Sequence, residues 1–506
     1  MDKQRYLEVT KKICSLFPLR KKEPPKGYCY VMSSDLLWVI MNPKYVTARV
    51  IASEEGCPVI AVSNKKEKFR ESITKEYEFD IKSLRDIGIA RTIVSFLKAF
   101  IFMLRVKPQK LEKVKISGIL VGDLIWDTII RRNLKVYTID SILNIHSFKV
   151  ILKAHLMIEL CQKLFGKYTP RYLIAQDMVY LEAIYARMGK YYGADIIMLT
   201  TGKPSHVLKS NAKENRLFFS VSYYDALQPL ISNPDTNWKI RADQMLEELF
   251  KGKGDWNVAN AYENKIVASR KTALSKIGIH NEKKNIIIMS HVFSDAPHCT
   301  EKMLYRDYYT WLVETLKLTK GIDKVNWILK PHPGRKSYQE DGIVEELYQK
   351  YEHPSLYWMP DEFSTLVLRE IADGIVTVSG SAGYELSCLG IPVVCTGRPF
   401  YSYFGYTINP KTIEEYKKLL QSMDKIEKLN KSKVEIAKLV FYAYNKWLDM
   451  EDAFARESWE IHDSYHRDYN VTLANHNYLR LLEKTIREEN FRNIYDVRYA
   501  RDLINL

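Results

Sequence analysis

The chain has 506 residues, and at roughly 100–200 residues per domain this length favours two or three folding units. Its 46% hydrophobic and 27% charged residues are ordinary globular values, which exclude a disordered or collagen-like chain. Seven scattered cysteines with no CxxC spacing argue against a disulfide framework and against a structural zinc site. The net charge of +15 favours polyanions or an anionic membrane as partners.

The first half of the chain alternates short β-branched runs with longer helical patterns, which indicates βαβ units and a parallel sheet. The predicted strands are 28–32, 58–62, 171–175 and 194–199. The predicted helices are 81–104, 146–165 and 179–191. No stretch has the roughly 18–20 apolar residues needed to cross a bilayer. The first residues lack the apolar core of a secretory signal, so we expect a cytoplasmic protein.

The most apolar run covers residues 91–105, and basic residues accompany it as far as Lys110. One interpretation is a helix that lies in a membrane interface, near a lipid-linked acceptor. The other is an ordinary core helix, and it is favoured because apolar residues cover most of the helix circumference. Contact with an anionic membrane is therefore the secondary prediction for this segment.

The second half of the chain repeats the alternation more clearly. Its predicted strands are 286–289, 325–329, 374–378 and 393–396, and its predicted helices are 304–318, 342–350 and 383–389. Helical patterns without a sheet signal follow at 432–449, 451–465 and 475–488. The predicted fold class is α/β, with two Rossmann-like domains that have parallel sheets. The predicted domains are 1–278 on the acceptor side, 279–430 for donor binding, and a helical tail, 431–506, that packs back on the first domain.

One loop of the second half runs from a predicted strand into a helix through the sequence SGSAGYE. Ligands of open parallel sheets bind beyond the carboxyl ends of the strands, where this loop lies. Small residues let a ligand approach the backbone, and the first N–H groups of a helix attract a phosphate. These residues are Ser379, Gly380, Ser381 and Gly383. Glu385 is placed to bind a ribose diol, although a serine N-cap with Glu385 in a capping box explains the pattern equally well without a ligand.

A second loop places His332 between two prolines at the end of a strand. Proline fixes its own φ angle, so the imidazole is held on a stiff segment. Lys330 and Arg335 add positive charge, and such a group can stabilise a phosphate that leaves during bond cleavage. A turn histidine among solvated lysines is the alternative. The rigid placement favours the functional interpretation.

A third loop, residues 290–298, carries His291, Asp295 and His298. Contact with the donor sugar and a purely structural loop are equally good interpretations of these residues. The spacing suggests a metal, but no fourth ligand is near in sequence and Pro297 breaks the helical spacing, so we expect no metal site.

The first half should supply a general base. Asp123 and Asp127 lie one helical turn apart on the same face, and two carboxylates in one cleft raise one of their pKa values. Asp177 follows a predicted strand, where a carboxylate can take a proton from an acceptor hydroxyl. An N-cap is the stronger interpretation of Asp177.

Two runs resemble a known family. LKPHP, which ends at Pro333, and VSGSAGYELSCLGIPVVCTGRPFYSYFGYT are similar to the donor-binding half of GT-B glycosyltransferases that build bacterial capsule and lipopolysaccharide, above all the capsular β-Kdo transferases. Those enzymes pair an HP dipeptide with a Ser/Thr-x-x-G-x-E loop and a G-x-P-F-Y-x-x-x-G-x-T run. The last run is matched by Gly397, Pro399, Phe400, Tyr401, Gly405 and Thr407. Bacterial sialyltransferases and teichoic-acid glycerophosphotransferases share the HP dipeptide and the serine loop.

The resemblance covers residues 285–407 and implies a GT-B fold with two facing Rossmann-like domains. It implies that His332 and the serine loop at Ser379, Gly380 and Ser381 hold the nucleotide phosphate, while Glu385 contacts the ribose. The loop at 290–298 departs from the family. Arg398 lies in the matched run, where an acidic donor sugar would need a cation, although arginines on a basic surface are usually solvated.

The leading prediction is therefore a metal-independent glycosyltransferase that needs no cofactor and uses a nucleotide-sugar as co-substrate. The favoured donor is a CMP-sugar such as CMP-Kdo, and the acceptor is a surface polysaccharide or lipid-linked glycan at the inner face of the plasma membrane. The alternatives of the same fold are a CDP-glycerol or CDP-ribitol phosphotransferase and a UDP-sugar epimerase. A basic nucleic-acid-binding protein or a non-catalytic scaffold is the alternative from another class. Dispersed basic residues without a binding motif weigh against nucleic acid.

Overall fold

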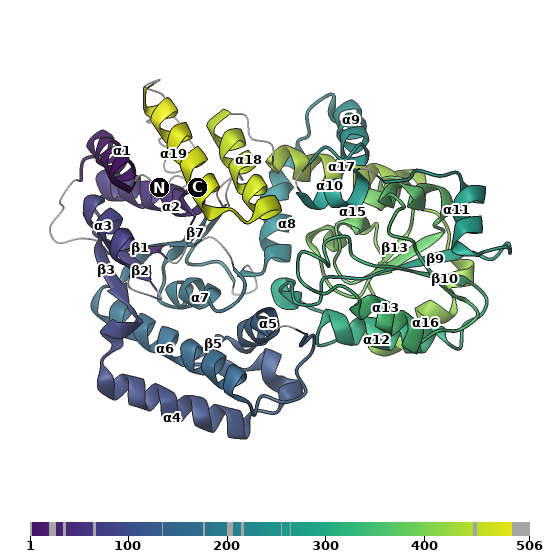
Figure 1. Cartoon of the computed structure of the whole chain (residues 1–506), viewed down its shortest axis with the longest axis horizontal. Helices are drawn as coiled ribbons and strands as arrows, with labels where there is room; N and C mark the ends of the chain where they lie inside the picture. Colours follow the sequence, from purple (N-terminus) through teal and green to yellow (C-terminus); the bar gives the residue numbers. More distant parts are fainter. Residues whose placement is uncertain are drawn as a thin grey trace. The chain divides into compact units, whose positions relative to one another are not determined.

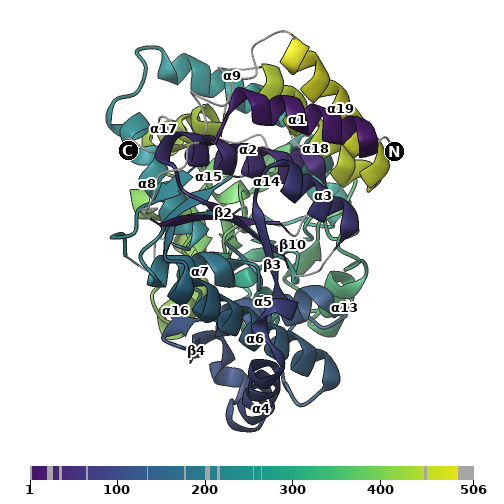
Figure 2. The ribbon, with the colours of Figure 1, turned by 90° about the vertical axis from the view of Figure 1, so that its left-hand side faces the viewer.

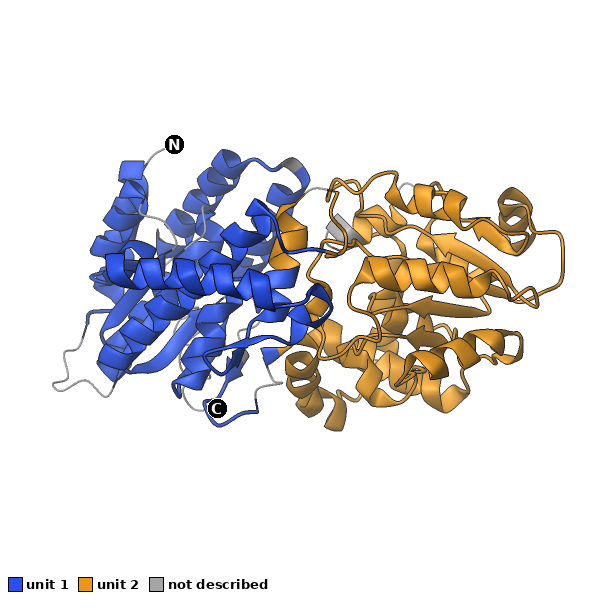
Figure 3. Ribbon diagram, turned by 90° about the horizontal axis from the view of Figure 1, so that it is seen from below, with its two compact units in different colours: residues 1–126, 141–217, 448–506 blue, residues 127–140, 218–447 orange. Residues whose placement is uncertain are grey.

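The computed structural model describes residues 3–19, 27–33, 37–63, 67–133, 135–175, 178–199, 206–213, 217–254, 256–263, 265–448 and 453–487 (Figure 1). The chain forms two compact units (Figure 3). Unit 1 consists of residues 1–126, 141–217 and 448–506, and unit 2 consists of residues 127–140 and 218–447. Helix α5 (Gly122–Arg132) begins in unit 1 and ends in unit 2.

Unit 1 contains a six-stranded sheet with the order β3-β2-β1-β6-β7-β8. All neighbours in it are parallel except β7 and β8, which pair antiparallel at one edge. The strands are β1 (Tyr28–Met32), β2 (Val59–Ser63), β3 (Asp80–Ser83), β6 (Pro170–Ala175), β7 (Asp195–Met198) and β8 (His206–Leu208). A two-stranded hairpin, β4 (Lys115–Ile116) and β5 (Ile119–Leu120), stands apart from this sheet.

Helices cover both faces of this sheet. Successive side chains of a strand point to opposite faces. In β1, Cys29 and Val31 join a core that includes residues of α1, α2 and α19, while the ring of Tyr30 lies 4.7 Å from that of Phe165 in α6. The helices of unit 1 are α1 (Lys3–Leu16), α2 (Trp38–Glu55), α3 (Lys68–Glu76), η1 (Leu84–Ile87), α4 (Ile89–Arg105), η2 (Pro108–Lys113), α6 (Ile145–Lys167), α7 (Ala183–Tyr191), α18 (Ala453–Asp468) and α19 (Val471–Arg487).

Unit 2 contains a fully parallel five-stranded sheet with the order β11-β10-β9-β12-β13. The strands are β9 (Asn285–Met289), β10 (Asn326–Lys330), β11 (Leu356–Trp358), β12 (Gly374–Thr377) and β13 (Val393–Cys395). The chain adds β10 and β11 on one side of β9 and then returns to add β12 and β13 on the other. The strand order therefore reverses between β9 and β12, and this switch point is where doubly wound sheets bind ligands.

Two separate cores fill the two faces of this second sheet. In β9, Ile287 belongs to one core, while Ile286 and Ile288 belong to the other, as the alternation of side chains requires. The helices of unit 2 are α8 (Phe219–Ser232), α9 (Trp238–Phe250), α10 (Trp256–Tyr262), α11 (Arg270–Ile277), η4 (Pro297–Cys299), α12 (Tyr308–Thr319), α13 (Ile343–Lys350), η5 (Thr365–Val367), α14 (Leu368–Ile371), α15 (Ala382–Ser387), η6 (Phe400–Phe404), α16 (Ile413–Gln421), η7 (Met423–Lys425) and α17 (Lys431–Leu448).

The α/β class, the two units with parallel sheets and the helical carboxyl-terminal segment are confirmed. The domain bounds differ from those expected at 278 and 430. Residues 218–278 belong to unit 2, since Leu227, Leu246 and Ala273 are part of one of its cores. The expected tail is divided: α17 contributes Phe441 to the core of unit 2, whereas α18 and α19 join the core of unit 1.

The structure differs from the sequence predictions at three elements. The predicted helix 81–104 contains strand β3 and η1 before α4 starts at Ile89, because Gly88, with φ of 94°, interrupts the helix. Strand β11 is only three residues long, too short to show a pattern. Helix α4 is exposed rather than a core helix. None of the helices in the described ranges is long and apolar enough to span a membrane.

Candidate functional site

The three loops singled out in the sequence follow β9, β10 and β12, which are neighbours at the switch point of unit 2. Hydrogen bonds join them. The backbone N–H of His332 donates to Ser290 Oγ at 2.9 Å, which connects the β10 loop to the β9 loop. The backbone N–H groups of Val378 and Ser379 donate to His291 Nε2 at 3.2 and 3.3 Å, which connects the β12 loop to the β9 loop. The β9 loop therefore holds the other two in place.

His291 supports the serine loop through hydrogen bonds to its backbone. Its ring is buried and stacks on Tyr308 with 4.3 Å between the ring centroids. Because Nε2 accepts two backbone N–H groups, the proton of the neutral ring is on Nδ1. Burial, with a smaller effect from His332, lowers the pKa of His291 to about 3, so the ring stays neutral. The geometry gives His291 a positioning role, whereas the sequence left donor contact and loop structure open.

His332 presents a hydrogen-bond donor, its Nε2–H group, at the end of β10. Its Nδ1 accepts the backbone N–H of Gly334 at 3.0 Å, so the neutral ring carries its proton on Nε2. Burial, and then the charges of Lys330 and Arg335, lower the pKa of His332 to about 4. None of the described residues accepts a hydrogen bond from Nε2. At neutral pH this ring is an uncharged N–H donor at the end of β10.

The serine loop supplies a second group of donors. In the described ranges, the backbone N–H groups of Gly380, Ser381 and Ala382 have no acceptor. Tyr401 O–H donates to the carbonyl of Gly380 at 2.7 Å and fixes the turn. A Cβ atom at Gly383 would lie 2.2 Å from that hydroxyl, which explains the glycine. Ser379 Oγ lies 3.2 Å from the hydroxyl of Tyr308. Three neighbouring amide hydrogens without an acceptor at a helix start are donors that suit an anion.

Glu385 already has a partner within unit 2. It is 6% exposed, and its Oε2 accepts a hydrogen bond from Tyr262 O–H at 2.8 Å. The carboxylate raises the pKa of Tyr262, after the larger effect of burial. This contact ties α15 to α10. The expected ribose contact of Glu385 stays a prediction.

A buried cation lies beside His332. Lys330 is 5% exposed and forms no ion pair or side-chain hydrogen bond with any residue in the described ranges. Burial, with Lys265 next, lowers the pKa of Lys330 to about 8. Burial also lowers the pKa of Lys265. Arg335, in contrast, is paired with Asp361 at 2.6 Å and Glu345 at 2.8 Å, so its charge is balanced. The sequence did not single out Lys265, which comes from a distant segment.

Asp127 and His298 form a pair. Nδ1 of His298 lies 2.6 Å from Asp127 Oδ1, and the backbone N–H of His298 donates to Oδ2 at 3.2 Å. An ionised carboxylate only accepts hydrogen bonds, so Nδ1 carries the proton and Nε2 is the basic atom of the ring. The sequence named both residues but gave no reason to pair them, since 171 positions separate them.

Glu340 explains the shape of the β9 loop. Its buried carboxylate accepts the backbone N–H groups of Phe293 and Ser294 at 2.7 and 2.8 Å, and the hydroxyl of Ser294 at 2.6 Å. Ala296 takes a positive φ of 40° in the turn that follows. Asp295, for which donor contact and loop structure were equally good interpretations, is exposed on this turn. No motif in the sequence points to Glu340.

The remaining candidates lie elsewhere or have other partners. Asp123 forms a buried ion pair with Arg187, with two contacts of 2.7 Å, so the two carboxylates of α5 have different partners. Arg398 lies 3.6 Å from Glu301 and over the ring of Tyr403. Asp177 lies outside the described residues. The described ranges contain no group of three or more His, Cys, Asp or Glu residues that could hold a metal ion.

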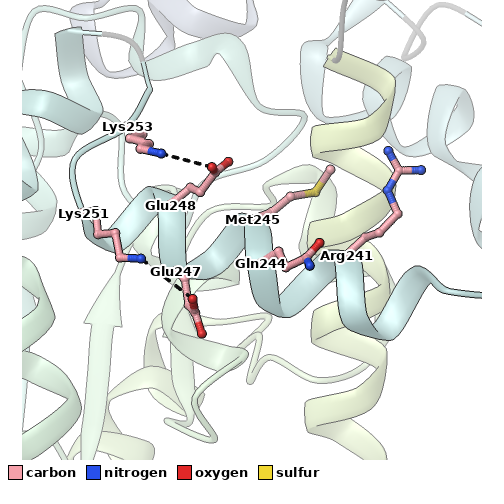
Figure 4. Close-up of a pocket in the computed structure, with 7 residues that line it drawn as sticks. All are labelled: Arg241, Gln244, Met245, Glu247, Glu248, Lys251 and Lys253. Carbon is pink, nitrogen blue, oxygen red and sulfur yellow. Dashed lines mark hydrogen bonds and ion pairs between the residues drawn. The ribbon is translucent and has the colours of Figure 1, made fainter.

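A surface hollow on α9 has the wrong chemistry for a phosphate site (Figure 4). Its lysines are paired with acids of the same segment: Lys253 with Glu248 at 3.2 Å and Lys251 with Glu247 at 3.9 Å. The hollow is lined by Arg241, Gln244, Met245, Glu247, Glu248, Lys251 and Lys253. Because the charges cancel locally, the switch point remains the candidate site.

Fold and site together define a doubly wound α/β unit of the kind that binds phosphorylated ligands at its switch point. Residues 270–437 match the family described as capsule polysaccharide biosynthesis protein. This range contains the three loops of the switch point. A search of curated protein sequences finds no match.

Solved structures with a similar fold include two from Thermosulfurimonas dismutans KpsC. The β-Kdo 2,4 transferase has 16% identity and a TM-score of 0.35, and the match covers 54% of this chain and 78% of that one. The β-Kdo 2,7 transferase has 18% identity and a TM-score of 0.32, with 56% and 80% covered. A glycosyltransferase from Rickettsia africae has 10% identity and a TM-score of 0.28, with 91% and 99% covered.

Proposed function

We propose that this protein is a glycosyltransferase of capsule or lipopolysaccharide synthesis that uses a nucleotide-activated sugar. The single observation that carries the proposal is that the His332 Nε2–H donor and the amides of Gly380, Ser381 and Ala382 follow strands on either side of β9 at one switch point. Uncharged donors in fixed positions bind a phosphate and stabilise it further as it leaves. The match of residues 270–437 to a capsule biosynthesis family supports the same activity.

The reaction breaks the bond between the anomeric carbon and the phosphate oxygen, and the phosphate keeps the electron pair. His332 Nε2–H and the serine-loop amides stabilise the negative charge that develops there. The acceptor hydroxyl forms the new bond to the anomeric carbon and loses its proton. We assign that proton to Nε2 of His298, whose ring orientation and tautomer are held by Asp127.

The favoured donor is a CMP-sugar with an acidic sugar, such as CMP-Kdo. Lys330 places a cationic side chain beside His332, with Lys265 near Lys330, and Asp361 is the acidic group that acts on both lysines. We propose that these cations bind the phosphate and the acidic group of the donor sugar. The resemblance of the LKPHP and VSGSAGYE runs to capsular β-Kdo transferases favours the same donor. The proposed acceptor is a surface polysaccharide or lipid-linked glycan, and the proposed site of action is the cytoplasmic side of the membrane.

The decisive measurement is transfer with a panel of CMP-, CDP- and UDP-activated donors, with the product mass as readout. A glycosyltransferase adds the mass of the sugar. A CDP-glycerol or CDP-ribitol phosphotransferase would add a polyol phosphate, and an epimerase would change the nucleotide-sugar without any acceptor. Titration with CMP, CDP and UDP identifies the nucleotide independently of the acceptor.

Two variants test the assignment of roles. We expect His332→Ala to lower kcat/KM by about 100-fold or more, the usual effect of removing one such donor, with an unchanged melting temperature. We expect His298→Gln to lower kcat while the affinity for the nucleotide stays the same. The matched control is His280→Ala, because His280 is an exposed histidine of the same unit. Full activity of His332→Ala would falsify the proposed function.

A further inference from the structure

Helix α4 presents an apolar face on the surface of unit 1. Its buried residues are Ser95, Ala99 and Phe102, and α6 is its main neighbour. Figures 1 and 2 both show α4 at the edge of the unit, with α6 beside it. The exposed large side chains of α4 are Ile89, Ile93, Val94, Phe96, Leu97, Phe100, Ile101 and Leu104. They are eight of the eighteen exposed large hydrophobic residues found in the described ranges, so the apolar exposure is concentrated on this helix.

The exposed side chains form a continuous strip. Residues three, four or seven apart lie on the same face of a helix. Ile93, Leu97 and Leu104 have this spacing and are 57%, 55% and 64% exposed. The small side chains of Ser95 and Ala99, which contact the rest of the unit, lie on the opposite face. Apart from Phe102, the helix therefore buries small residues and exposes its large apolar ones, the reverse of a core helix.

Basic residues follow one side of this strip. Arg91, Lys98 and Arg105 are seven residues apart, so about two helical turns separate each from the next and they share a side. From Ile89 to Lys115 the chain has seven basic residues and one acid, Glu112. Arg91 and Lys98 share a single carboxylate, Glu159, at 3.5 and 2.7 Å. The surroundings of the apolar strip thus keep a net positive charge.

We propose that α4 lies in the interface of a membrane that contains anionic lipids. The apolar strip enters the boundary between headgroups and acyl chains, and Arg105, Lys107 and Lys110 bind lipid phosphates. A second copy of this chain is a less suitable partner for the apolar strip than a membrane. It would bring the same unbalanced cations into the interface between the two copies. The proposal is independent of the proposed activity, since it involves no residue at the ends of the unit 2 strands.

Vesicle flotation of the full chain tests this proposal. The vesicles contain phosphatidylcholine with about one-third phosphatidylglycerol, and phosphatidylcholine alone serves as comparison. We expect the protein to float with the anionic vesicles, to float less with the neutral ones, and to dissociate partly as salt is raised. Leu97→Glu combined with Ile101→Glu should lower partitioning by about tenfold or more, because two apolar side chains leave the interface and two anions replace them.

The matched control is Ile240→Glu combined with Val267→Glu. These residues are similarly exposed, at 64% and 58%, and lie in unit 2, so the control makes the same change of charge elsewhere. It should float like the unchanged protein, and both variants should keep the same melting temperature. Equal flotation of both variants, or no flotation of the unchanged protein at low salt, would overturn the proposal. A concentration-dependent dimer that only the α4 variant dissociates, without vesicle binding, would assign the strip to a second copy instead.

Discussion

Lys330 and His332 are separated by one residue, yet they carry different charges at neutral pH. Burial is the main cause of the lowered pKa in both. For His332 the result is a pKa of about 4, so the ring is neutral. For Lys330 the pKa is about 8, so the ammonium group is still largely charged. The site therefore combines an uncharged hydrogen-bond donor with a cation that loses its charge just above neutral pH.

This difference predicts how donor affinity depends on pH. A phosphodiester analogue of the donor has a fixed charge, so changes in its affinity report on the protein. We expect affinity to stay constant across pH 6.5, the ordinary pKa of histidine, because His332 does not titrate there. It should fall as the pH rises through about 8, where Lys330 loses its proton. Bound anion favours the charged lysine and moves the fall to somewhat higher pH.

Calorimetric titration of the phosphodiester analogue over this pH range measures the effect. Lys330→Gln should bind more weakly at neutral pH and should show no fall near pH 8. A decrease centred near pH 6.5 would mean that the site needs a charged histidine, contrary to the assignment of His332 as a neutral donor.

At the scale of elements, the contact between η6 and the start of α15 depends on one small residue, Gly383. Tyr401 of η6 crosses the start of α15 at Gly383 and holds the carbonyl of Gly380. We predict that Gly383→Ala displaces Tyr401, since the added methyl group would lie 2.2 Å from its hydroxyl, and that nucleotide affinity falls by about tenfold or more as the amides lose their alignment.

Nucleotide titration of Gly383→Ala, compared with Gly321→Ala, checks this prediction. Gly321 is a suitable control because a Cβ atom there meets nothing within 4 Å. Tyr401→Phe should have a smaller effect, about 1 kcal/mol for one lost hydrogen bond. Normal nucleotide affinity in Gly383→Ala would contradict the role given to the loop.

Elements with a strong local pattern could be predicted from the sequence. The strands of unit 2 are buried on both faces, and their isoleucine and valine runs are typical of parallel sheets. The HP dipeptide and the serine loop were found because their residues are contiguous. Lys265, Tyr308 and Glu340 were missed because their roles come from long-range contacts. An exposed α4 was the less favoured of two interpretations, since an apolar helix has the same sequence pattern whether it is buried or not.

At the scale of the whole molecule, the last helices belong to different cores. Phe441 of α17 is 1% exposed in a core of unit 2, while Leu482 of α19 is fully buried in the core of unit 1. Helix α19 is also joined to α2, because Asn475 Oδ1 accepts the backbone N–H of Trp38 at 2.8 Å. The chain thus completes the fold of unit 1 with residues that follow unit 2.

This division predicts separable effects of two core substitutions. Phe441→Ala should lower the stability of unit 2 by about 3–5 kcal/mol, and Leu482→Ala should lower that of unit 1 by about 2–5 kcal/mol, through lost burial and the cavities left behind. Only Phe441→Ala should weaken nucleotide binding near the melting transition, because the phosphate site lies entirely in unit 2. Hydrogen exchange of the two units, measured with and without nucleotide, distinguishes the effects. If Leu482→Ala exposed the amides of β9 and β12 as readily as those of β1 and β2, the two cores would unfold as one, and the phosphate site would depend on both.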